Sequence, residues 1–117
     1  MKLTRLYTGD DGESHFEDVE VSLKDAGVGI LQRSKISKAT GVFFSVTNGP
    51  FYSHWHNAPR RQYIIILEGE VEVGIGDGTK RQFGPGDILL VEDATGRGHT
   101  TRSVNDQFRR EVFVTLD

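Results

Sequence analysis

Three of the four histidines lie in two short stretches, and imidazole is the side chain of this sequence best suited to bind a metal ion. His54 and His56 are separated only by Trp55, and His99 follows Gly98. Residues i and i+2 of a β-strand point to the same side, so we expect His54 and His56 to converge on one face. Three imidazoles are enough to bind a divalent transition metal and leave positions open for water or substrate. Taken alone, His-x-His is also typical of a solvated strand.

The composition restricts the kinds of site that the chain can build. Its 117 residues include no cysteine, which excludes thiolate metal sites, thiol nucleophiles and disulfide scaffolds. Fourteen basic residues stand against 17 acidic ones, for a formal net charge of −3. This balance does not favour a protein that covers nucleic acid phosphates or an anionic membrane surface. We therefore expect a small-molecule ligand or substrate, no nucleic acid partner and no membrane partner.

The length suits one hydrophobic core, and we expect a single domain over residues 1–117. The longest aliphatic run, residues 64–67, is far shorter than the roughly 20 apolar residues of a membrane-spanning helix. Residues 1–7 lack the apolar core and the cleavage site of a secretory signal. A cytoplasmic location is the simplest expectation.

Alternating apolar and polar residues predict half-buried strands over residues 19–23 and 71–75. Continuous apolar runs predict more deeply buried strands over residues 62–67 and 88–91, and further strands are expected over 41–47 and 110–116. Turn residues separate these runs, and residues 22–27 have room for one helical turn at most. The pattern predicts an all-β sandwich or small barrel, with the 14 glycines marking its turns.

From Gly49 onward the sequence resembles the cupin family. The first cupin motif corresponds to about residues 49–69, which contain Gly49, His54-Trp55-His56, Gln62 and Gly69. The second corresponds to about residues 86–102, which begin at Gly86 and contain Gly96-Arg97-Gly98-His99. The order, the spacing and the strand pattern of both motifs agree with the family.

The resemblance implies a cupin-type double-stranded β-helix, a jelly-roll barrel that is often a homodimer. It also implies a divalent metal inside the barrel, Zn, Fe, Ni or Mn, held by three histidines and a carboxylate. His54, His56 and His99 match the histidine positions, whereas Gln62 occupies the carboxylate position. Glu92 stands where a proline is usual, and the second-motif loop is about two residues longer than in the family pattern.

Gln62 has a physical consequence for such a site. Three imidazoles and an amide leave a divalent ion with its full charge, whereas a glutamate would offset one unit. The ion is then a stronger Lewis acid and harder to oxidise, which favours isomerase, lyase or hydrolase chemistry over oxygenase chemistry. Two roles stay open for Gln62, a metal ligand or a hydrogen-bond donor to a metal-bound water or a backbone group. Three-histidine iron oxygenases in the family keep dioxygenase chemistry open.

Strand parity predicts which other residues face the substrate. If His54 and Gln62 point inward, so do Tyr52 and Ile64, and the inward neighbour of His99 is Thr101. A second group lies in the loops beside these strands, where a guanidinium is able to bind a carboxylate or phosphate, namely Arg60 and Arg97.

Two acidic residues at the start of the second-motif loop, Glu92 and Asp93, are candidates for a general base or a substitute ligand, or they form a solvated acidic loop. The leading hypothesis is a metal-dependent enzyme acting on a small anionic or carbonyl-containing metabolite. The alternatives are a barrel that binds a small molecule without catalysis, and a metal-free sugar epimerase or isomerase that uses a histidine and a carboxylate.

Overall fold

The structure is a computed structural model that describes residues 1–105 and 107–117, and the described residues form strands and loops without any helix. It follows that no described segment is a helix long and apolar enough to cross a membrane. The strands are β1 (Lys2–Thr8), β2 (Ser14–Glu20), β3 (Lys24–Asp25), β4 (Gln32–Arg33), β5 (Gly41–Thr47), β6 (Tyr52–His56), β7 (Gln62–Glu68), β8 (Val71–Gly74), β9 (Lys80–Phe83), β10 (Ile88–Val91), β11 (His99–Ser103) and β12 (Arg109–Thr115).

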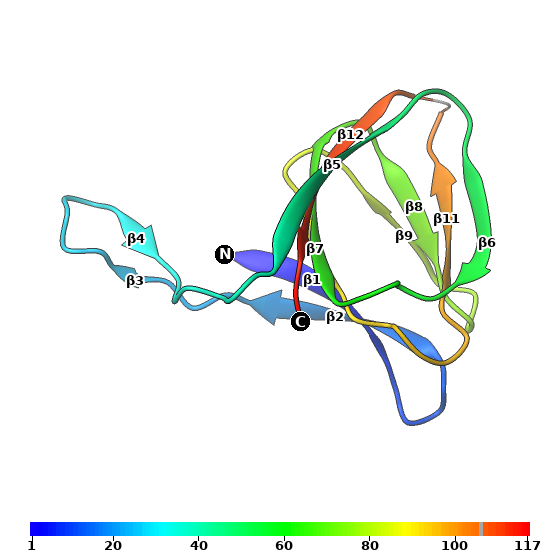
Figure 1. The fold of residues 1–117 in the computed structure, drawn as a ribbon, viewed down its shortest axis with the longest axis horizontal. Helices are drawn as coiled ribbons and strands as arrows, with labels where there is room; N and C mark the ends of the chain where they lie inside the picture. Colours follow the sequence, from blue (N-terminus) through cyan, green and yellow to red (C-terminus); the bar gives the residue numbers. More distant parts are fainter. Residues whose placement is uncertain (106) are drawn as a thin grey trace.

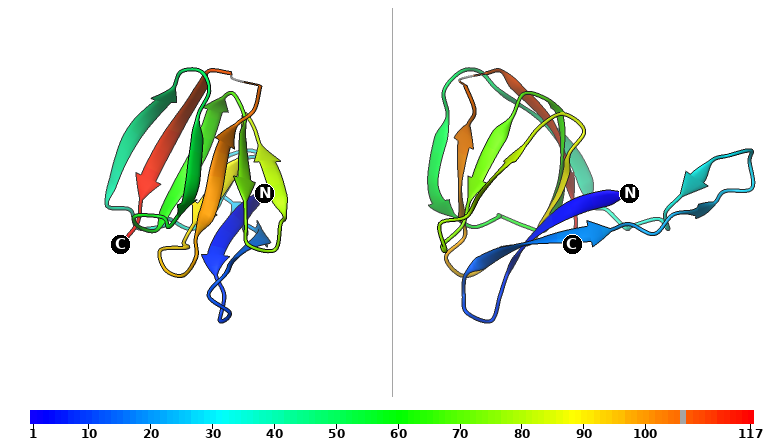
Figure 2. Two further views of the ribbon diagram at one scale, coloured as in Figure 1. Left: turned by 90° about the vertical axis from the view of Figure 1, so that its right-hand side faces the viewer. Right: turned by 180° about the vertical axis from the view of Figure 1, so that it is seen from behind.

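Two sheets face each other and enclose the interior of a barrel (Figure 1, Figure 2). One sheet has six strands in the order β2-β1-β10-β7-β12-β5, and the other has four in the order β6-β11-β8-β9. The strands pair antiparallel except β1 and β10, which run parallel. The all-β prediction is confirmed, and the two-layered jelly-roll form agrees with it.

Most strands occupy the ranges that the hydrophobic pattern predicts, but the prediction over residues 19–23 is wrong in position. The strand there is β2, which ends at Glu20 because its partner β1 begins at Lys2, opposite Glu20. Beyond that point the amide of Val21 still donates to the carbonyl of Met1 at 2.7 Å, and then β2 has no partner residues left on β1. Alternation alone does not reveal where a partner strand stops.

The hydrophobic core fills one side of the barrel. Its buried side chains come mainly from β1, β8, β9 and β10 and from the middle of β7, where Ile66 has no exposed surface. Leu6 is 1% exposed and packs in the same cluster as Val71 and Leu89. The wall formed by β5 and β12 contributes no residue to this cluster, and the interior next to it is hollow.

The hairpin β3–β4 projects from the barrel as an arm (Figure 1). Each of its strands has two residues, and they pair with each other, Lys24 with Arg33 and Asp25 with Gln32. A two-stranded hairpin of this size is not stable on its own in water. The arm therefore needs a further packing surface.

Glu92 follows β10 and connects three separate parts of the chain. Its carboxylate accepts hydrogen bonds from Nε of Arg5 on β1 and from Nε of Arg61 in the loop before β7, each at 2.5 Å. Arg61 also donates to the carbonyl of Asp117 at 3.3 Å. Partial burial raises the pKa of Glu92, but the hydrogen bonds and charges of Arg5 and Arg61 outweigh this and hold the pKa below its usual range. Glu92 is therefore a structural anion and a weak base.

We expect Glu92→Gln to lower the free energy of unfolding at pH 7 by about 1.5–3 kcal/mol, the range for hydrogen bonds to charged groups. Because the folded-state pKa of Glu92 is depressed, its contribution is present above the unfolded-state pKa and is lost as the pH falls through the folded-state pKa. Urea unfolding at several pH values between 7 and 3 should show the two proteins converging in stability. Glu68→Gln, at an exposed carboxylate 3.6 Å from Arg110, is the control and should change little. An equal loss for Glu92→Gln at every pH would contradict this assignment.

Candidate functional site

A cavity of about 690 Å³ lies inside the barrel between the two sheets. Most of its wall is apolar, with side chains such as Phe43, Ile64 and Phe113. A small number of polar side chains interrupt this wall, namely Ser45, Thr47, Asn48, His56, Gln62, His99, Thr101, Arg109 and Glu111. A concave, mostly apolar space with a few placed polar groups is the usual form of a small-molecule site.

His99 enters the cavity from β11 and is held from behind by Asp93. Its Nδ1 lies 2.5 Å from Oδ2 of Asp93, and the same oxygen accepts a hydrogen bond from the hydroxyl of Ser14 at 2.7 Å. Asp93 is fully buried, and His99 is 6% exposed. Because a carboxylate accepts, Nδ1 carries the proton, and Nε2 of neutral His99 keeps its lone pair.

His56 stands beside His99 at the end of β6, with the two ring centres 4.5 Å apart. Nδ1 of His56 lies 2.7 Å from the carbonyl oxygen of His54 and 3.0 Å from the hydroxyl of Ser53. A carbonyl oxygen can only accept, so this ring also carries its proton on Nδ1 and keeps the lone pair on Nε2. The two neighbouring imidazoles thus share the tautomer that binds metals or accepts protons at Nε2.

His54 does not join this pair, and the expectation that His54 and His56 face the same side is wrong. On β11, His99 and Thr101 are two residues apart, but their partners on β6, His56 and Ser53, are three apart. One strand thus contains an extra residue, a β-bulge that breaks the two-residue alternation. His54 is exposed and makes an edge contact with the ring of Tyr52, 4.8 Å away. Its role as a metal ligand stays a prediction.

Gly98 allows β11 to approach β6 at the histidine pair. Its φ is +80°, and a Cβ placed there would lie 2.1 Å from the carbonyl oxygen of His56. The side-chain amide of Asn57 secures the same loop, donating to the carbonyls of Thr95 and Gly96 at 2.8 and 3.0 Å. Only glycine fits this position without displacing the backbone that carries His56.

Gln62 begins β7 and faces the cavity with 5% of its surface exposed. Its Oε1 accepts a hydrogen bond from Nη1 of Arg60 at 3.3 Å. An amide oxygen has two lone pairs, so Gln62 retains an acceptor for a further partner. Arg60 itself is exposed and does not line the cavity.

The other predicted substrate-facing residues divide into two groups. Ile64 and Thr101 line the cavity, as strand parity predicts. Tyr52 does not, because it lies on the far side of the bulge from His56 and is 53% exposed on the outer surface. Arg97 also lies outside, with its guanidinium 4.2 Å from the centre of a Trp55 ring. The predictions of substrate contact for Tyr52, Arg60 and Arg97 have no support in this geometry.

Two charged residues in the cavity wall are absent from the sequence-based prediction. Arg109 and Glu111 lie on β12, are 5% and 6% exposed, and form an ion pair with Nε and Oε1 3.1 Å apart. The signal that was available is their spacing, because Arg109, Glu111 and Phe113 are alternate residues of one strand and share a face. The neighbouring Arg110 is exposed, so the Arg109-Arg110 pair is not a uniformly solvated surface.

The donor set of the cavity fits a metal ion in part. Within residues 1–105 and 107–117, no three His, Asp or Glu side chains converge as a group that could hold an ion. The two imidazoles lie side by side, and the buried amide of Gln62 belongs to the wall of the same cavity. Together they offer N, N and O donors of the kind that first-row divalent metals accept. Asp93 behind His99 and the carbonyl behind His56 are the kind of outer partners that orient metal-binding histidines.

The same site contains a histidine–carboxylate pair that can work without a metal. Asp93 does not line the cavity, so it reaches a ligand only through His99. Nε2 of His99 can accept a proton from a bound molecule while Asp93 stabilises the charge that forms on the ring. Glu92, the other acidic candidate, is bound by Arg5 and Arg61 and lines no part of the cavity.

Comparison with known proteins agrees with this geometry. The family model described as the EutQ-like cupin domain matches residues 38–111, which is more than half of the chain. The match includes the strands that carry His56, Gln62 and His99 and ends at Glu111. No curated protein matches the sequence.

Solved structures share the fold at low sequence identity. The cupin domain of Cnp3 from Schizosaccharomyces pombe is 12% identical, with a TM-score of 0.53, and the match covers 99% of this chain and 88% of that one. A Cupin 2 conserved barrel domain protein from Salinispora arenicola is 21% identical, with a TM-score of 0.51. That match covers 65% of this chain and 61% of the Salinispora chain, so it spans less than two thirds of that protein. Both matches concern the fold alone.

Proposed function

Because the chain belongs to the EutQ-like cupin domain family, we propose that its barrel is an enzyme site for a small anionic or carbonyl-containing metabolite. His56, His99 and Gln62 would hold a divalent transition metal, Zn, Fe, Ni or Mn. The observation that carries the proposal is the pair of imidazole rings 4.5 Å apart in the wall of an otherwise mostly apolar cavity.

The proton positions of the two rings support this role. Each Nδ1 is already engaged, His56 by a backbone carbonyl and His99 by Asp93, so each ring has its Nε2 lone pair to offer. These fixed partners also prevent the rings from rotating away from each other. The site is therefore arranged before any ligand arrives, which is what a binding or catalytic centre requires.

A bound divalent ion would supply Lewis acidity towards a carbonyl or carboxylate oxygen of the metabolite. Gln62 contributes no charge, so the positive charge of the site is not reduced by this residue. The apolar wall near Ile64 and Phe113 excludes bulk water and strengthens electrostatic interactions inside the cavity. These properties favour isomerase, lyase or hydrolase chemistry.

Metal analysis of protein purified without an affinity tag tests the site directly. We expect a first-row transition metal in the natural protein and its loss in His56→Ala and in His99→Ala. We expect Asp93→Asn to weaken metal affinity about 10- to 100-fold, the usual effect of removing an outer partner. Circular dichroism should show that each variant remains folded.

His54→Ala is the matched control, because the cupin motif and the structure make different predictions for it. If His54 is a third ligand, as the motif implies, the metal is lost. If the bulge keeps His54 outside the cavity, the metal is retained. Stoichiometric metal in a His56→Ala/His99→Ala double variant would contradict the proposed centre.

The buried His99–Asp93 hydrogen bond favours a second candidate function, a metal-free epimerase or isomerase. In this case Nε2 of His99 removes the proton from a carbon next to a carbonyl group and returns it to the same or a neighbouring atom. Asp93 holds the ring and stabilises its charged form. Neither step requires an ion.

Solvent exchange distinguishes the two candidates. After exhaustive chelation, the protein is incubated in deuterium oxide with a panel of keto acids and keto sugars, and NMR follows deuterium at the carbon next to the carbonyl. Exchange that survives chelation and is lost in His99→Gln supports the metal-free reaction. Exchange that stops on chelation and returns with added metal supports the metal centre. Saturable binding without any turnover would instead indicate a non-catalytic binding protein.

A further inference from the structure

The ion pair of Arg109 and Glu111 lies in the cavity wall, but the chemistry proposed above does not use it. Both side chains are more than nine-tenths buried and come from β12, in register with Thr47 and Ser45 of β5. A buried Arg–Glu pair is not by itself stabilising, because desolvation of the two charges offsets their attraction. Its position in the cavity therefore points to a ligand.

Arg109 has a donor that nothing in the described chain accepts. Its Nε is bonded to Glu111, but Nη1 is fully enclosed and has no hydrogen-bond partner among residues 1–105 and 107–117. A buried donor without an acceptor is costly, more so when the group is charged. The backbone fixes the residue here, since a Cβ on Gly69 would lie 2.9 Å from Cα of Arg109.

We infer that Arg109 binds a carboxylate oxygen of the metabolite that enters the cavity, and that this anchor selects carboxylate-bearing molecules. A carboxylate suits the Arg109 guanidinium better than a neutral oxygen does, because charge-assisted hydrogen bonds are about twice as strong as neutral ones. This role rests on the proposed function only in using the same cavity. It requires no metal, so the two assignments can fail separately.

Titration calorimetry on the chelated protein tests whether Arg109 anchors a carboxylate. The affinities of carboxylates with two to six carbons, from glyoxylate to gluconate, are each compared with that of a neutral analogue of similar size. Gluconate and glucitol form one such pair. We expect at least one carboxylate to bind and its neutral analogue to bind at least about 10-fold more weakly. Arg109→Gln should weaken the carboxylate by about 10- to 100-fold, the range for losing a charged hydrogen bond.

Arg109→Gln leaves Glu111 buried and unpaired, so the Arg109→Gln/Glu111→Gln double variant provides a second version with no lone charge. Arg97→Gln is the matched control, since Arg97 lies outside the cavity, and it should bind as the natural protein does. Equal binding of a carboxylate and its neutral analogue, unchanged binding in both Arg109 variants, or no carboxylate binding at all would overturn the inference. Metal content should be the same in all these variants.

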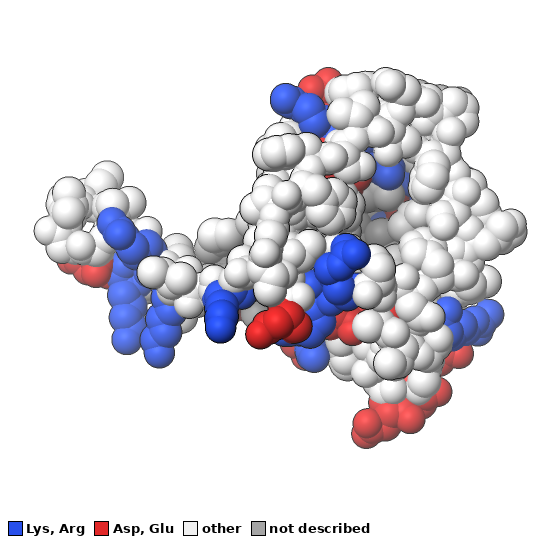
Figure 3. Space-filling view, viewed as in Figure 1, with Lys and Arg blue, Asp and Glu red and all other residues white. Residues whose placement is uncertain are grey.

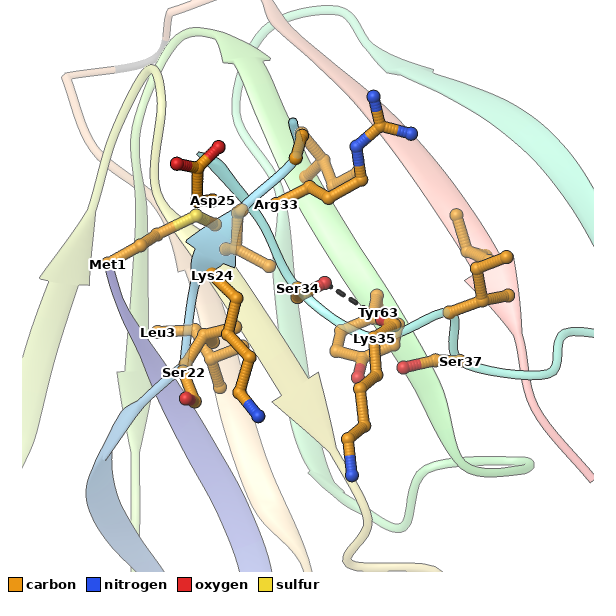
Figure 4. Close-up of a pocket in the computed structure, with 16 residues that line it drawn as sticks. Met1, Leu3, Ser22, Lys24, Asp25, Arg33, Ser34, Lys35, Ser37 and Tyr63 are labelled. Atoms are coloured by element: carbon orange, nitrogen blue, oxygen red, sulfur yellow. Dashed lines mark hydrogen bonds between the residues drawn. The ribbon is translucent and has the colours of Figure 1, made fainter. Parts of the chain in front are cut away.

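The projecting arm carries a second, independent inference. Ile30 and Ile36 have 101% and 99% of their surface exposed, and Val28 and Leu31 beside them are also exposed. A groove of about 1030 Å³ separates the arm from the outer face of the six-stranded sheet, where Leu3 and Tyr63 line it (Figure 4). Three of these large aliphatic side chains lie in the loop of a marginal hairpin and Ile36 lies just after it, and together they require a covering surface.

The outer face of the same sheet is also apolar. Paired residues on neighbouring strands form one row across it, Phe44, Val112, Ile65 and Ile88. Phe44 is 78% exposed at the edge strand β5, and Val42 and Val46 beside it are exposed too. Each molecule thus presents an apolar arm and an apolar face, which is the self-complementarity of a symmetric dimer.

The charges of the two parts are complementary. The arm together with the segment that follows it, residues 24–38, contains four basic residues and one acidic residue, a formal charge of +3. Since the whole chain carries −3, the remainder carries −6. Figure 3 shows basic side chains along the arm. The arm of one molecule is therefore attracted to the body of another.

Dimerisation is common among cupins and is not itself the inference. We propose which surfaces meet in a dimer of this chain: each arm packs on the outer sheet face of its partner. A stable interface buries about 800 Å² per partner, and exposed large side chains from both the arm and β5 contribute to it. Sedimentation velocity should find a dimer at micromolar concentration.

Ile36→Asp on the arm and Phe44→Asp on the face should each shift the protein to monomer, while circular dichroism keeps the β-sheet signal. Ser37→Asp, next to Ile36 and already polar, is the matched control and should remain a dimer. A natural protein that is monomeric at every concentration would overturn the proposal, as would an arm that packs on its own sheet or on a different protein. Ile36→Asp and Phe44→Asp variants that both stay dimeric would overturn it as well.

Discussion

The carboxylate of Asp93 is the buried charge on which the arrangement of the site depends. A carboxylate without exposed surface costs several kcal/mol unless it is well hydrogen-bonded. Ser14 on β2 and His99 on β11 supply hydrogen bonds to one of its oxygens, and the backbone carbonyl of Asp93 accepts from the amide of Ala58 at 3.1 Å. The N-terminal hairpin, the loop after β6 and the start of β11 therefore meet at a single residue. Oδ1 of the carboxylate has no hydrogen-bond partner among the described residues, so Ser14 and His99 at Oδ2 carry the stabilisation of the charge. This bond fixes the orientation of His99 in the cavity.

A second constraint sets which histidine joins His99. The bulge on β6 places Ser53 and His56 on the inner side and leaves His54 outside, while its carbonyl oxygen still fixes the ring of His56. Gly98 then lets β11 come close enough for the two rings to lie side by side. This side of the cavity is thus shaped by a local irregularity of the barrel, a feature that is common beside active sites. His54 takes part through its backbone rather than through its imidazole.

The sequence predicts the strands well because hydrophobic alternation reports which face of each strand is buried. The ranges predicted around β5, β7, β8, β10 and β12 correspond to the observed strands within one or two residues. Parity also predicts correctly that Ile64 and Thr101 line the cavity. Strand parity fails for Tyr52 because a bulge adds one residue to β6, and no residue type in the sequence indicates this bulge. The sequence does not reveal that Arg109 lines the cavity, because two adjacent arginines are typical of a solvated surface. The register of β12 with β5 shows which of the two faces the interior.

The arm shows a further limit of reading one chain. Residues 24–40 have no strong strand pattern, and their large apolar side chains are exposed in the single molecule. Sequence periodicity describes burial within a chain and does not distinguish it from burial between chains. The apolar row from Phe44 to Ile88 has the same ambiguity, because it satisfies the pattern of a two-sided buried strand whichever molecule covers it.

The parallel pairing of β1 with β10 has a consequence for how the protein is made. During synthesis β1 can form only its hairpin with β2 until residues 88–91 have left the ribosome, more than 80 residues later. The edge strand β5 is paired later still in chain order, because its partner β12 is the last of the described strands. Closing such distant pairs is slow and leaves apolar strand edges exposed in the meantime. The six-stranded sheet therefore stays incomplete until β12 has emerged, and closure of the barrel follows as a late event.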